Sequence, residues 1–495
     1  MGKTCAELFK GLDGTIIGNQ EELVTGLAFR SDKVVPGDVF FCIVGTVVDG
    51  HTFAQDAIDR GAKVLVVERK LYLVDTSDVT LVVVDDTRRA MAQAASRYYG
   101  NPSRFMQLVG VTGTNGKTTT TFLVESMVKA AQKKCGIIGT TGNLIDGRME
   151  EAAHTTPESP DLQELFARMR DVETDVVAIE VSSHALDLKR TFATTFAVTS
   201  FTNLTQDHLD YHHTFEAYFE AKAKLFSSDY PAKRVISVDD KWGVALAQRC
   251  VDAGDHVITF GFDESADIHP TKVDYSSTQT KVELAVCGRE YAFTYPLVGR
   301  FNVSNIMNAF GIGMCLGLDS DTIIRGLSTA PGIPGRLQRV ASEHSNGVDV
   351  FVDYAHTPDA LDKALASIMA LNPRRTLVVF GCGGDRDATK RSIMGKVALV
   401  ADYVIVTSDN PRTEDPNAII RDIVSGMEAG KDHYEVVADR RDAIARAIEL
   451  AQPGDAVLVA GKGHEDYQII GHVKVHFDDR EVVAEEFARA AKARA

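Results

Sequence analysis

One seven-residue stretch, Gly113-Thr114-Asn115-Gly116-Lys117-Thr118-Thr119, constrains the fold of this chain more than any other. It follows an apolar run at 108–111 that is typical of a buried strand, and it precedes residues 120–128, where apolar side chains recur at helical spacing. In a strand–turn–helix unit of this kind, backbone N–H groups at the helix start hold phosphate oxygens. Lys117 would add a positive charge, and the Thr118 hydroxyl would reach Mg²⁺. The stretch therefore predicts a nucleotide-binding loop, against the alternative of an ordinary turn with a surface lysine.

Composition limits the classes of protein to which this chain can belong. At 495 residues, the chain is long enough for about three domains. Hydrophobic residues make up 44% and charged residues 25%, as in globular proteins that bury sizeable cores. The formal net charge of −16 argues against general binding to nucleic acid, which usually needs a basic face. A nucleotide site must then concentrate positive potential locally, at loops and helix starts.

Cysteine usage and the first residues predict a reduced, cytoplasmic location. The seven cysteines are scattered and include no Cys-x-x-Cys pair, which suggests neither a disulfide framework nor a zinc site. Residues 1–7 carry charges where a signal peptide would need its apolar stretch. No apolar run approaches the roughly 18 residues of a membrane span. We therefore expect a cytoplasmic protein. We also expect it to be a monomer that works on small molecules, with neither nucleic acid nor membrane as a partner.

Short apolar strands alternate with helices along the chain, which predicts an α/β fold in three domains. Residues 1–103 form a small α/β domain in this interpretation, and the turn-forming run at 100–103 ends it. Residues 104–334 form a central P-loop ATPase-like domain with a parallel or mixed sheet. The run 330–335, with two prolines and two glycines, marks the second boundary because it cannot continue a helix or a central strand.

The last segment, 335–495, shows the strand–helix rhythm most clearly. Apolar strands at 348–352, 376–380, 403–407 and 456–460 each run into a polar loop that contains glycine or proline. This rhythm predicts a Rossmann-like, doubly wound sheet with helices on both faces. Ligands of such sheets bind at the carboxyl ends of the strands, where most of the polar motifs of this chain lie.

Three places in the central domain are candidates for chemistry beside the phosphate loop. Glu180 ends an apolar strand, where a carboxylate is a natural oxygen ligand for Mg²⁺, and a solvated glutamate is the alternative. His208 lies in a loop with three histidines and two aspartates, so metal ligation and a packing or surface role are about equally supported. Lys222 lies in residues 218–226, whose sequence by itself indicates an amphipathic helix with exposed lysines.

Taken together, these motifs resemble the Mur ligases. The resemblance covers nearly the whole chain in order and rests on Gly-Thr-Asn-Gly-Lys-Thr at 113–118, Glu180-Val181-Ser182-Ser183-His184, Asp207-His208-Leu209-Asp210-Tyr211-His212 and Ala-Lys-x-x-Leu-Phe at 221–226. Mur ligases are ATP-dependent amino-acid ligases that build the peptide of bacterial peptidoglycan. The resemblance implies ATP and Mg²⁺ as cofactors, and it implies as catalytic residues Lys117, Lys222, His208 and Arg336.

The resemblance also implies the ligands of the metal ions and of the nucleotide. In this family the lysine that matches Lys222 carries a carbamate derived from CO₂, which presents anionic oxygens where an ammonium would repel Mg²⁺. Thr118 and Glu180 would hold one Mg²⁺, and His208 and modified Lys222 would hold the second. The residues implied to bind the nucleotide are Gly113, Thr114, Asn115, Gly116, Lys117, Thr118, Thr119, Asn302, Asn305, Asp353 and His356.

Further residues resemble the substrate contacts of the family. The UDP-linked sugar and its dipeptide would be bound by Ser31, Thr155, Thr156, Ser182 and Arg190. Ser31 stands between Arg30 and Asp32, an inverted order of the Asp-Ser-Arg found in the family. Arg336 would clamp the transferring phosphate, and a solvated linker arginine is the alternative.

Asp409-Asn410-Pro411-Arg412 resembles the signature of the Mur ligases that add meso-diaminopimelate. Diaminopimelate is lysine with a second carboxylate on its distal amino-bearing carbon. A guanidinium can bind that carboxylate in a bidentate manner, through two parallel hydrogen bonds. Arg386 would add a second cation, although the glycine run after Phe380 is also compatible with a nucleotide-phosphate turn. The set implied for diaminopimelate is Arg386, Asp409, Asn410, Pro411, Arg412, Gly461 and Glu465.

The implied reaction adds meso-diaminopimelate to the D-glutamate of UDP-N-acetylmuramoyl-L-alanyl-D-glutamate. The γ-carboxylate would attack the γ-phosphate of ATP to give an acyl phosphate, and the amine of diaminopimelate would then attack the acyl carbon. Because the substrates come from three domains, we expect the third domain to close over ATP. The alternatives are the same reaction with L-lysine, a folylpolyglutamate-type ligase, and a P-loop regulatory ATPase that makes no amide.

Overall fold

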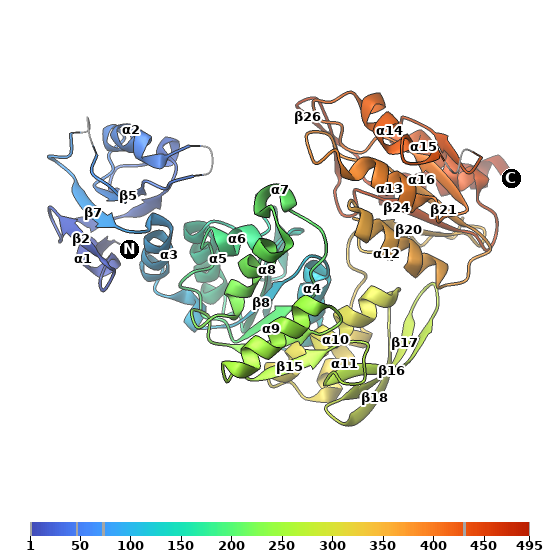
Figure 1. The fold of residues 1–495 in the computed structure, drawn as a ribbon, viewed down its shortest axis with the longest axis horizontal. Helices are drawn as coiled ribbons and strands as arrows, with labels where there is room; N and C mark the ends of the chain where they lie inside the picture. The colour runs from blue at the N-terminus through green and yellow to red at the C-terminus, as the bar shows by residue number, and fades with distance from the viewer. Residues whose placement is uncertain (1, 46–47, 72–74, 429–431, 495) are drawn as a thin grey trace.

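The computed structural model describes residues 2–45, 48–71, 75–428 and 432–494. Three larger sheets are present, one in each of the predicted segments 1–103, 104–334 and 335–495. Figure 1 shows the blue N-terminal part and the orange C-terminal part on either side of the green and yellow central part. The α/β class expected from the sequence is confirmed, whereas the exact domain boundaries stay predictions.

The N-terminal part is a five-stranded sheet in the order β2-β7-β6-β5-β4, in which only the β2–β7 pair is antiparallel. A two-stranded sheet of β1 and β3 lies beside the chain start. The strands are β1 (Lys3–Thr4), β2 (Gly14–Ile17), β3 (Leu23–Val24), β4 (Gly26–Ala28), β5 (Asp38–Phe41), β6 (Val64–Val67) and β7 (Thr80–Val84). The helices are α1 (Cys5–Leu8), α2 (Ala54–Asp59) and α3 (Thr87–Tyr98).

The central part is an eleven-stranded mixed sheet in the order β11-β10-β9-β12-β8-β13-β14-β15-β16-β17-β18. Its strands are β8 (Gln107–Thr112), β9 (Cys135–Gly139), β10 (Gly142–Ile145), β11 (Arg148–Glu150), β12 (Val176–Glu180), β13 (Val198–Phe201), β14 (Lys233–Ser237), β15 (Val257–Phe260), β16 (Ile268–Tyr275), β17 (Thr280–Val286) and β18 (Arg289–Tyr295). Its helices are α4 (Lys117–Ala130), α5 (Ser159–Asp171), α6 (Ser183–Asp187), α7 (Leu209–His212), α8 (Phe215–Ala223), α9 (Lys241–Asp252), α10 (Arg300–Cys315) and α11 (Ser320–Ser328).

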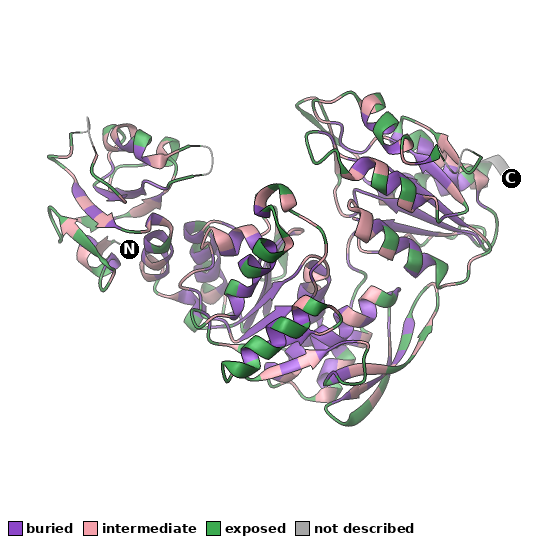
Figure 2. Ribbon diagram, in the orientation of Figure 1, coloured by how far each residue is buried: buried purple, intermediate pink, exposed green. Residues whose placement is uncertain are grey.

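Alternate side chains of the central strands enter two different cores, so helices cover both faces of this sheet. In β8, Val109 packs in one core with Val303 of α10, and Leu108 packs in the other with Phe166 of α5. Figure 2 shows the buried purple strands between helices whose outer faces are green. β12, β8 and β13 are parallel neighbours, so the loops that follow them meet at one edge of the sheet.

The C-terminal part is a six-stranded sheet in the order β19-β20-β24-β21-β22-β23, parallel except for β19. In β21, Val378 and Leu377 belong to different cores, which confirms the doubly wound arrangement. The strands are β19 (Gln338–Arg339), β20 (Asp349–Asp353), β21 (Thr376–Phe380), β22 (Tyr403–Val406), β23 (Tyr434–Val436) and β24 (Ala456–Ala460), followed by the hairpin β25 (Tyr467–Ile470) and β26 (Val473–His476). The helices are α12 (Pro358–Met369), α13 (Lys390–Ala398), α14 (Pro416–Val424), α15 (Arg440–Leu450) and α16 (Asp479–Arg494).

Candidate active site

The phosphate loop joins β8 to α4, and two of its positions accept only glycine. Gly113 and Gly116 have φ values of 143° and 89°, in the region that favours glycine. A Cβ at Gly113 would lie 1.9 Å from the Thr202 hydroxyl oxygen, and one at Gly116 would lie 2.4 Å from Asn305 Oδ1. The loop is therefore packed closely against the segment after β13 and against α10, and α4 begins directly after it at Lys117.

Two lysines point at the same carbonyl of the phosphate loop. Lys117 Nζ donates to the carbonyl oxygens of Gly113 and Thr114 at 2.9 and 2.8 Å. Lys222 Nζ donates to the Gly113 oxygen at 2.8 Å. Burial lowers the pKa of both ammonium groups, and for Lys222, whose pKa lies well below its ordinary value, the charge of Lys117 adds to the effect. Two basic side chains thus gather at this loop, which is where the acidic composition requires positive potential to be concentrated.

The expectation that residues 218–226 present exposed lysines is wrong for Lys222. This residue is 1% exposed, and its ammonium lies 4.5 Å from the centre of the Tyr218 ring, whereas Lys224 is exposed and pairs with Asp187 at 2.6 Å. α8 packs in the core around the parallel strands, and this packing brings Lys222 into contact with the phosphate loop. Periodicity alone does not distinguish a buried lysine from an exposed one.

Glu180 is buried at the carboxyl end of β12, and the alternative of a solvated glutamate is wrong. Its side chain accepts hydrogen bonds from the backbone N–H of Thr140 at 2.9 Å and from the Thr140 hydroxyl at 3.2 Å. A Cβ on Gly139 would lie 2.3 Å from Glu180 Oε1, so the glycine makes room for the carboxylate. The electrostatic field of Glu180 acts on Lys117, which places this anion beside the phosphate loop.

His208 starts α7 in a left-handed conformation, with φ of 54°. Its ring meets that of His184 edge to face at 4.9 Å, and its Nε2 lies 3.4 Å from Asp207 Oδ2. Burial lowers the pKa of His208 to about 4, which leaves a neutral imidazole able to bind a metal near pH 7. Lys117 and Lys222 also lower this pKa, so His208 faces the same loop.

The predicted metal ligands Thr118, Glu180, His208 and Lys222 fit Mg²⁺ only in part. Glu180 offers carboxylate oxygens and Thr118 a hydroxyl, which are the hard donors that Mg²⁺ prefers. Lys222 as an ammonium would repel the ion, and a carbamate at its Nζ would supply the missing anionic oxygens. Among the described residues, no group of three or more His, Cys, Asp or Glu side chains is arranged to hold a metal ion.

The asparagines of α10 form a short relay toward the phosphate loop. Asn302 Nδ2 donates to the Val298 carbonyl at 2.8 Å, and Asn305 Nδ2 donates to Asn302 Oδ1 at 3.0 Å. This relay fixes Asn305 Oδ1 at the position where it meets Gly116. Both asparagines are buried, so their amides act as fixed parts of the loop's surroundings.

Arg336 reaches the phosphate loop, and the alternative of a linker arginine in solvent is wrong. Its Nη2 donates to the Thr118 hydroxyl at 3.3 Å, and its guanidinium lies 5.0 Å from the Tyr354 ring centre. Asp353 Oδ2 accepts from the Leu337 backbone N–H at 2.6 Å, and burial raises the pKa of Asp353 to about 6. His356 Nδ1 donates to the Tyr354 carbonyl at 2.8 Å, and burial lowers the pKa of this imidazole.

Asp359 is a contact of the phosphate loop that the sequence reasoning missed. Its Oδ2 accepts from Asn115 Nδ2 at 3.1 Å and from the Thr205 hydroxyl at 3.0 Å. Asp359 stands in the first turn of α12, directly after the motif that contains His356, and this adjacency was the signal in the sequence. The C-terminal part thus touches the loop through Asp359 and through Arg336.

Four of the five predicted contacts to the UDP-linked substrate come together near Glu180. The Thr156 hydroxyl donates to the Glu180 carbonyl at 2.8 Å and accepts from the Ser182 backbone N–H at 3.1 Å. Arg190 Nη1 donates to the Thr156 carbonyl at 2.9 Å, and the Thr155 hydroxyl lies 3.1 Å from that of Thr140.

Ser31 lies apart from that group, in the 3₁₀ turn Ser31–Lys33 of the N-terminal part. Its hydroxyl helps to hold the pKa of Asp56 below the usual range, and its neighbours Arg30 and Asp32 pair with each other at 2.9 Å. The inverted charge order thus forms an ion pair on the surface.

Arg88 and Glu158 connect the N-terminal part to the Arg190 side of the site. Glu158 forms an ion pair with Arg190, whose Nε lies 2.9 Å from Oε1, and its Oε2 accepts a hydrogen bond from Arg88 Nη1 at 3.3 Å; all three side chains are largely buried. Sequence reasoning missed both residues, because neither belongs to a recognisable motif.

The loops after β21, β22 and β24 converge, as the sequence predicts for strand ends of one sheet. Arg412 Nη1 donates to the Gly384 carbonyl at 2.7 Å, and the Gly384 backbone N–H donates to the Asn410 carbonyl at 2.9 Å. Asn410 Nδ2 donates to Glu465 Oε2 at 2.9 Å. The predicted diaminopimelate residues of these loops are thus joined in one hydrogen-bonded group.

The remaining residues of that set lie around the same group. A Cβ on Gly461 would lie 2.5 Å from Asp409 Oδ2, so this glycine permits the close approach of a buried carboxylate. A Cβ on Gly384 would lie 1.9 Å from the Pro411 carbonyl oxygen. Arg386 is exposed, at the outer side of the glycine run.

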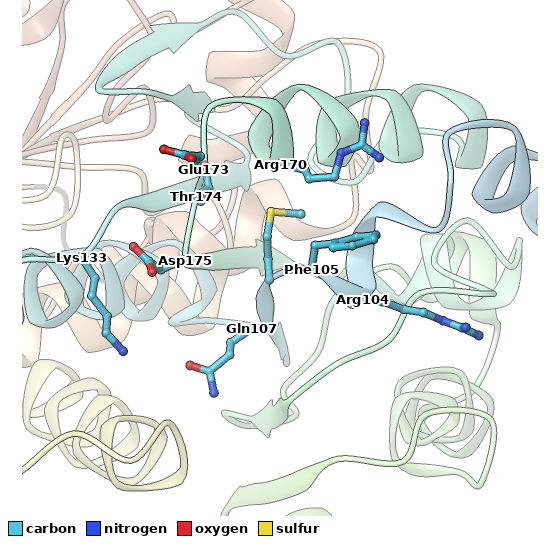
Figure 3. Close-up of a pocket in the computed structure, with 9 residues that line it drawn as sticks. Arg104, Phe105, Gln107, Lys133, Arg170, Glu173, Thr174 and Asp175 are labelled. Carbon is cyan, nitrogen blue, oxygen red and sulfur yellow. The ribbon is translucent and has the colours of Figure 1, made fainter. Parts of the chain in front are cut away.

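An open hollow of about 590 Å³ lies at the opposite edge of the central sheet (Figure 3). Gln107 at the start of β8 and Asp175 just before β12 line it, together with Phe105, Lys133 and Arg170. The described residues that line this hollow include none of the predicted site residues. No helix in the described ranges combines the length and apolar character needed to cross a bilayer.

Comparisons with known proteins agree with this arrangement. Family models match three stretches of the chain, the "Mur ligase family, catalytic domain" at residues 23–99, the "Mur ligase middle domain" at 111–313 and the "Mur ligase, glutamate ligase domain" at 335–463. A Clostridium botulinum protein named UDP-N-acetylmuramoyl-L-alanyl-D-glutamate--2,6-diaminopimelate ligase is 42% identical over 480 residues, which cover 97% of this chain and 98% of that protein.

Solved structures show the same relationship. One structure of a UDP-N-acetylmuramoyl-L-alanyl-D-glutamate--2,6-diaminopimelate ligase matches with a TM-score of 0.73 and 33% identity, covering 99% of each chain. MurF ligase from Thermotoga maritima, solved in complex with ADP, matches with a TM-score of 0.62 over 95% of this chain and 99% of that one. At 20% identity, this second likeness shows the fold alone. With relatives this similar over nearly its whole length, the chain belongs to the Mur ligase family.

Proposed function

We propose that this chain is the Mur ligase that adds meso-diaminopimelate to the D-glutamate of UDP-N-acetylmuramoyl-L-alanyl-D-glutamate, with ATP, in peptidoglycan precursor synthesis. The observation that carries the proposal is the joining of Arg412, Asn410 and Glu465 at the strand ends of the C-terminal sheet. These residues offer a cation and an anion within one hydrogen-bonded group, which suits an amino acid whose distal carbon bears both a carboxylate and an ammonium. The 42% identical relative of that name supports the same substrate.

ATP would bind at the phosphate loop, where Lys117, Lys222 and Arg336 meet. The backbone N–H groups at the start of α4 would hold phosphate oxygens, and Lys117 would leave the carbonyls of its own loop to meet them. Arg336 would contribute a guanidinium from the C-terminal part. Mg²⁺, when bound, would neutralise charge on the phosphates, held by Thr118, Glu180, His208 and a carbamate on Lys222.

The reaction would proceed in two balanced steps. An oxygen of the D-glutamyl γ-carboxylate attacks the γ-phosphorus, the bond from that phosphorus to the bridging oxygen breaks, and ADP leaves with the electron pair. The neutral amine of diaminopimelate then attacks the acyl carbon, phosphate leaves, and the nitrogen loses a proton. The protein's contribution is to bring two anions together and to hold the amine in line, which Lys117 and Arg336 serve by their charge.

Discrimination against lysine would rest on Arg412. Its guanidinium carries five N–H donors, and Nη1 is held by the Gly384 carbonyl. Backbone hydrogen bonds with Ile469 at 3.1 Å and Gly471 at 2.7 Å fix the position of Arg412 against the β25–β26 hairpin. A guanidinium held in this way binds a carboxylate in a defined place and meets no counter-charge on lysine.

The test is amino-acid-dependent phosphate release with ATP, Mg²⁺ and the UDP-linked dipeptide. We expect diaminopimelate to stimulate release far more than lysine or glutamate does. Arg412→Ala should abolish most of the preference for diaminopimelate over lysine while ATP still binds. Slow ATP turnover that no amino acid stimulates would instead indicate a regulatory ATPase, and an unchanged preference in Arg412→Ala would contradict the role given to this arginine.

A further inference from the structure

Lys462 is a fully buried cation in the loop after β24. Its Nζ lies 3.5 Å from Glu465 Oε2 and 3.9 Å from Asp409 Oδ1. It also donates to Asn410 Oδ1 at 3.4 Å. A buried ammonium is costly unless it is paired and hydrogen-bonded, so a lysine in this place is tied to the groups that it contacts. All three of these groups belong to the proposed diaminopimelate set.

The contact with Lys462 helps to fix the orientation of the Asn410 amide. The backbone N–H of Ile469 donates to Asn410 Oδ1 at 2.9 Å, so two donors meet the oxygen side of this amide. Asn410 Nδ2 is thereby turned toward Glu465 Oε2, to which it donates at 2.9 Å. Glu465 is held at one oxygen by both Asn410 and Lys462, and an incoming ammonium meets a carboxylate of fixed position.

The charges behind the site are nearly balanced. Arg440 pairs with Asp479 through two hydrogen bonds of 2.8 and 2.7 Å, and both side chains are fully buried. Asp409, Glu465 and Asp479 then face the two cations Lys462 and Arg440, which leaves one net negative charge. One net negative charge is the complement of one ammonium. Without Lys462, the group would carry two negative charges in excess.

We propose that Lys462 is a positioning residue that keeps the Glu465 carboxylate charged and the Asn410 amide oriented toward it. The carboxylate then binds the distal ammonium of the incoming amino acid. This inference rests on the proposed function, because it assumes that these loops bind the amino acid. It divides the recognition in two. Lys462 acts through Glu465 on the ammonium, which diaminopimelate and lysine share, whereas Arg412 acts on the carboxylate, which only diaminopimelate carries.

The electrostatics of Glu465 give this role a pH dependence. Burial and the charge of Asp409 raise the pKa of Glu465, and Lys462 and Asn410 oppose them. The other charged or titratable groups that face Glu465 are Arg440 from α15, Tyr354 after β20 and Tyr467 of β25. With Lys462 neutralised, one of the groups that hold this pKa down is lost and the pKa rises further. The carboxyl then binds a proton more readily near neutral pH and loses it as the pH rises.

The test compares Lys462→Met with the parent protein by steady-state kinetics at pH 7.0 and 8.5. We expect the variant to raise the KM for diaminopimelate at least about tenfold at pH 7.0, and we expect the ratio of variant to parent KM to fall to about threefold or less at pH 8.5. Taking the ratio at each pH removes the titration of the substrate itself. The KM values for ATP and for the UDP-linked dipeptide should stay within about twofold of the parent, because neither contacts this group.

Three further variants separate positioning from simple structural damage. Lys474→Met is the matched control, since Lys462 and Lys474 both lie over the Tyr467 ring, at 5.5 and 4.0 Å from its centre, but Lys474 is exposed on β26. Its KM ratio for diaminopimelate should not change with pH. Lys462→Arg should restore most of the affinity. Lys462→Met/Glu465→Gln keeps the net charge of the group and should show a high KM at both pH values, with no recovery.

A pH-independent ratio in Lys462→Met, or recovery at pH 8.5 in the double variant, would overturn the inference. Should Lys462→Met fail to fold by circular dichroism, the double variant and Lys462→Arg decide it by the same criteria. The parent protein tests the proposed function separately. If the parent uses lysine, the ratios are measured with lysine, which carries the same ammonium, and if it uses neither amino acid, both the proposed function and this inference fail.

Discussion

The Arg336 guanidinium donates a hydrogen bond to the Thr118 hydroxyl at 3.3 Å, across 218 positions of the sequence. Thr118 belongs to the phosphate loop, and Arg336 lies just before the first strand of the C-terminal sheet. The two parts of the molecule that would hold ATP and the incoming amino acid are therefore in contact at the loop itself. Ligand binding would act on this contact, because phosphate and Mg²⁺ would compete for both groups.

Replacing Arg336 should impair phosphoryl transfer more than substrate binding. Arg336→Ala removes a guanidinium from the place where charge on the transferring phosphate would develop, and losses of about 10²- to 10³-fold in kcat are typical for removal of one such group. The measurement is phosphate release at saturating substrates. The KM for diaminopimelate should change little, because Arg336 hydrogen-bonds Thr118 of the phosphate loop and not the residues proposed to bind diaminopimelate.

Arg339→Ala is the control for that variant. Arg339 lies three positions later, on β19, and pairs with Asp349 at 2.6 Å. We expect near-parental activity. Equal losses in the two variants would mean that the region matters for stability and not for charge at the phosphate.

Lys222 should be modified by CO₂, and activity should depend on it. Its ammonium is buried, and burial together with Lys117 lowers its pKa well below the ordinary value, so the amine is more often neutral and able to attack CO₂. We expect native mass spectrometry to detect the added mass of one CO₂, lost in Lys222→Met. Activity should fall in CO₂-free buffer and return with bicarbonate.

Lys224→Met is the matched control, since Lys224 lies two positions away and pairs with Asp187 on the surface. It should keep both the CO₂ adduct and the activity. An unmodified, fully active parent protein in CO₂-free buffer would contradict the role given to Lys222.

Glu180→Gln should raise the requirement for Mg²⁺. The substitution keeps the hydrogen bond from the Thr140 backbone but removes a buried anion, which is the property that a divalent cation needs. We expect the Mg²⁺ concentration for half-maximal activity to rise about tenfold or more, as substitutions of metal-site groups typically produce. Glu164→Gln, on the exposed face of α5, should leave the Mg²⁺ dependence unchanged. A Glu180→Gln protein that responds to Mg²⁺ as the parent does would rule out this ligand.

Local patterns in the sequence were sufficient for the strands and for the loops that follow them. The run at 376–380 forms β21 with the predicted bounds. A continuous apolar run of this length between turn residues is typical of a strand that is buried on both faces of a parallel sheet. The phosphate loop could be recognised from its glycines, because its turn needs positive φ values that other residues rarely adopt. The convergence of the loops around Asn410 followed from strand direction alone.

Contacts between distant segments could not be predicted in this way. Lys222 is on a helix whose sequence also suits a solvated face, and only the packing of α8 carries its ammonium to Gly113. Lys462 stands between two glycines, where a lysine is usually exposed, and its burial depends on loops from two other strands. The contact of Asp359 with Asn115 likewise depends on how the C-terminal part meets the central part. These features depend on tertiary structure, and no local pattern encodes them.

Asp353→Asn should stabilise the protein at neutral pH. The pKa of this buried carboxyl is raised from 3.8 to about 6, so its contribution to stability is full below pH 4 and is lost as the pH rises through 6. Asparagine stays neutral and can still accept from the Leu337 backbone. The variant should therefore gain up to about 3 kcal/mol over the parent above pH 6, and little at pH 4.

The measurement is denaturant unfolding of both proteins between pH 4 and 7. Asp349→Asn serves as control, because Asp349 lies on the same strand and pairs with Arg339 near the surface. Its stability difference from the parent should not follow the same curve. If the free energy of unfolding changes with pH in the same way in Asp353→Asn and in the parent, the ionised Asp353 carboxylate does not destabilise the fold. The variant should also bind ATP less well, in keeping with a carboxylate kept for function at a cost in stability.

A competition between two amino acids tests whether this protein selects meso-diaminopimelate. The parent protein is incubated with ATP, Mg²⁺ and UDP-N-acetylmuramoyl-L-alanyl-D-glutamate in the presence of equal concentrations of meso-diaminopimelate and L-lysine, and the products are identified by mass. We expect one main product, the dipeptide extended by diaminopimelate, formed in step with ADP. A main product that contains lysine, or ADP formed with no extended peptide, would contradict this expectation.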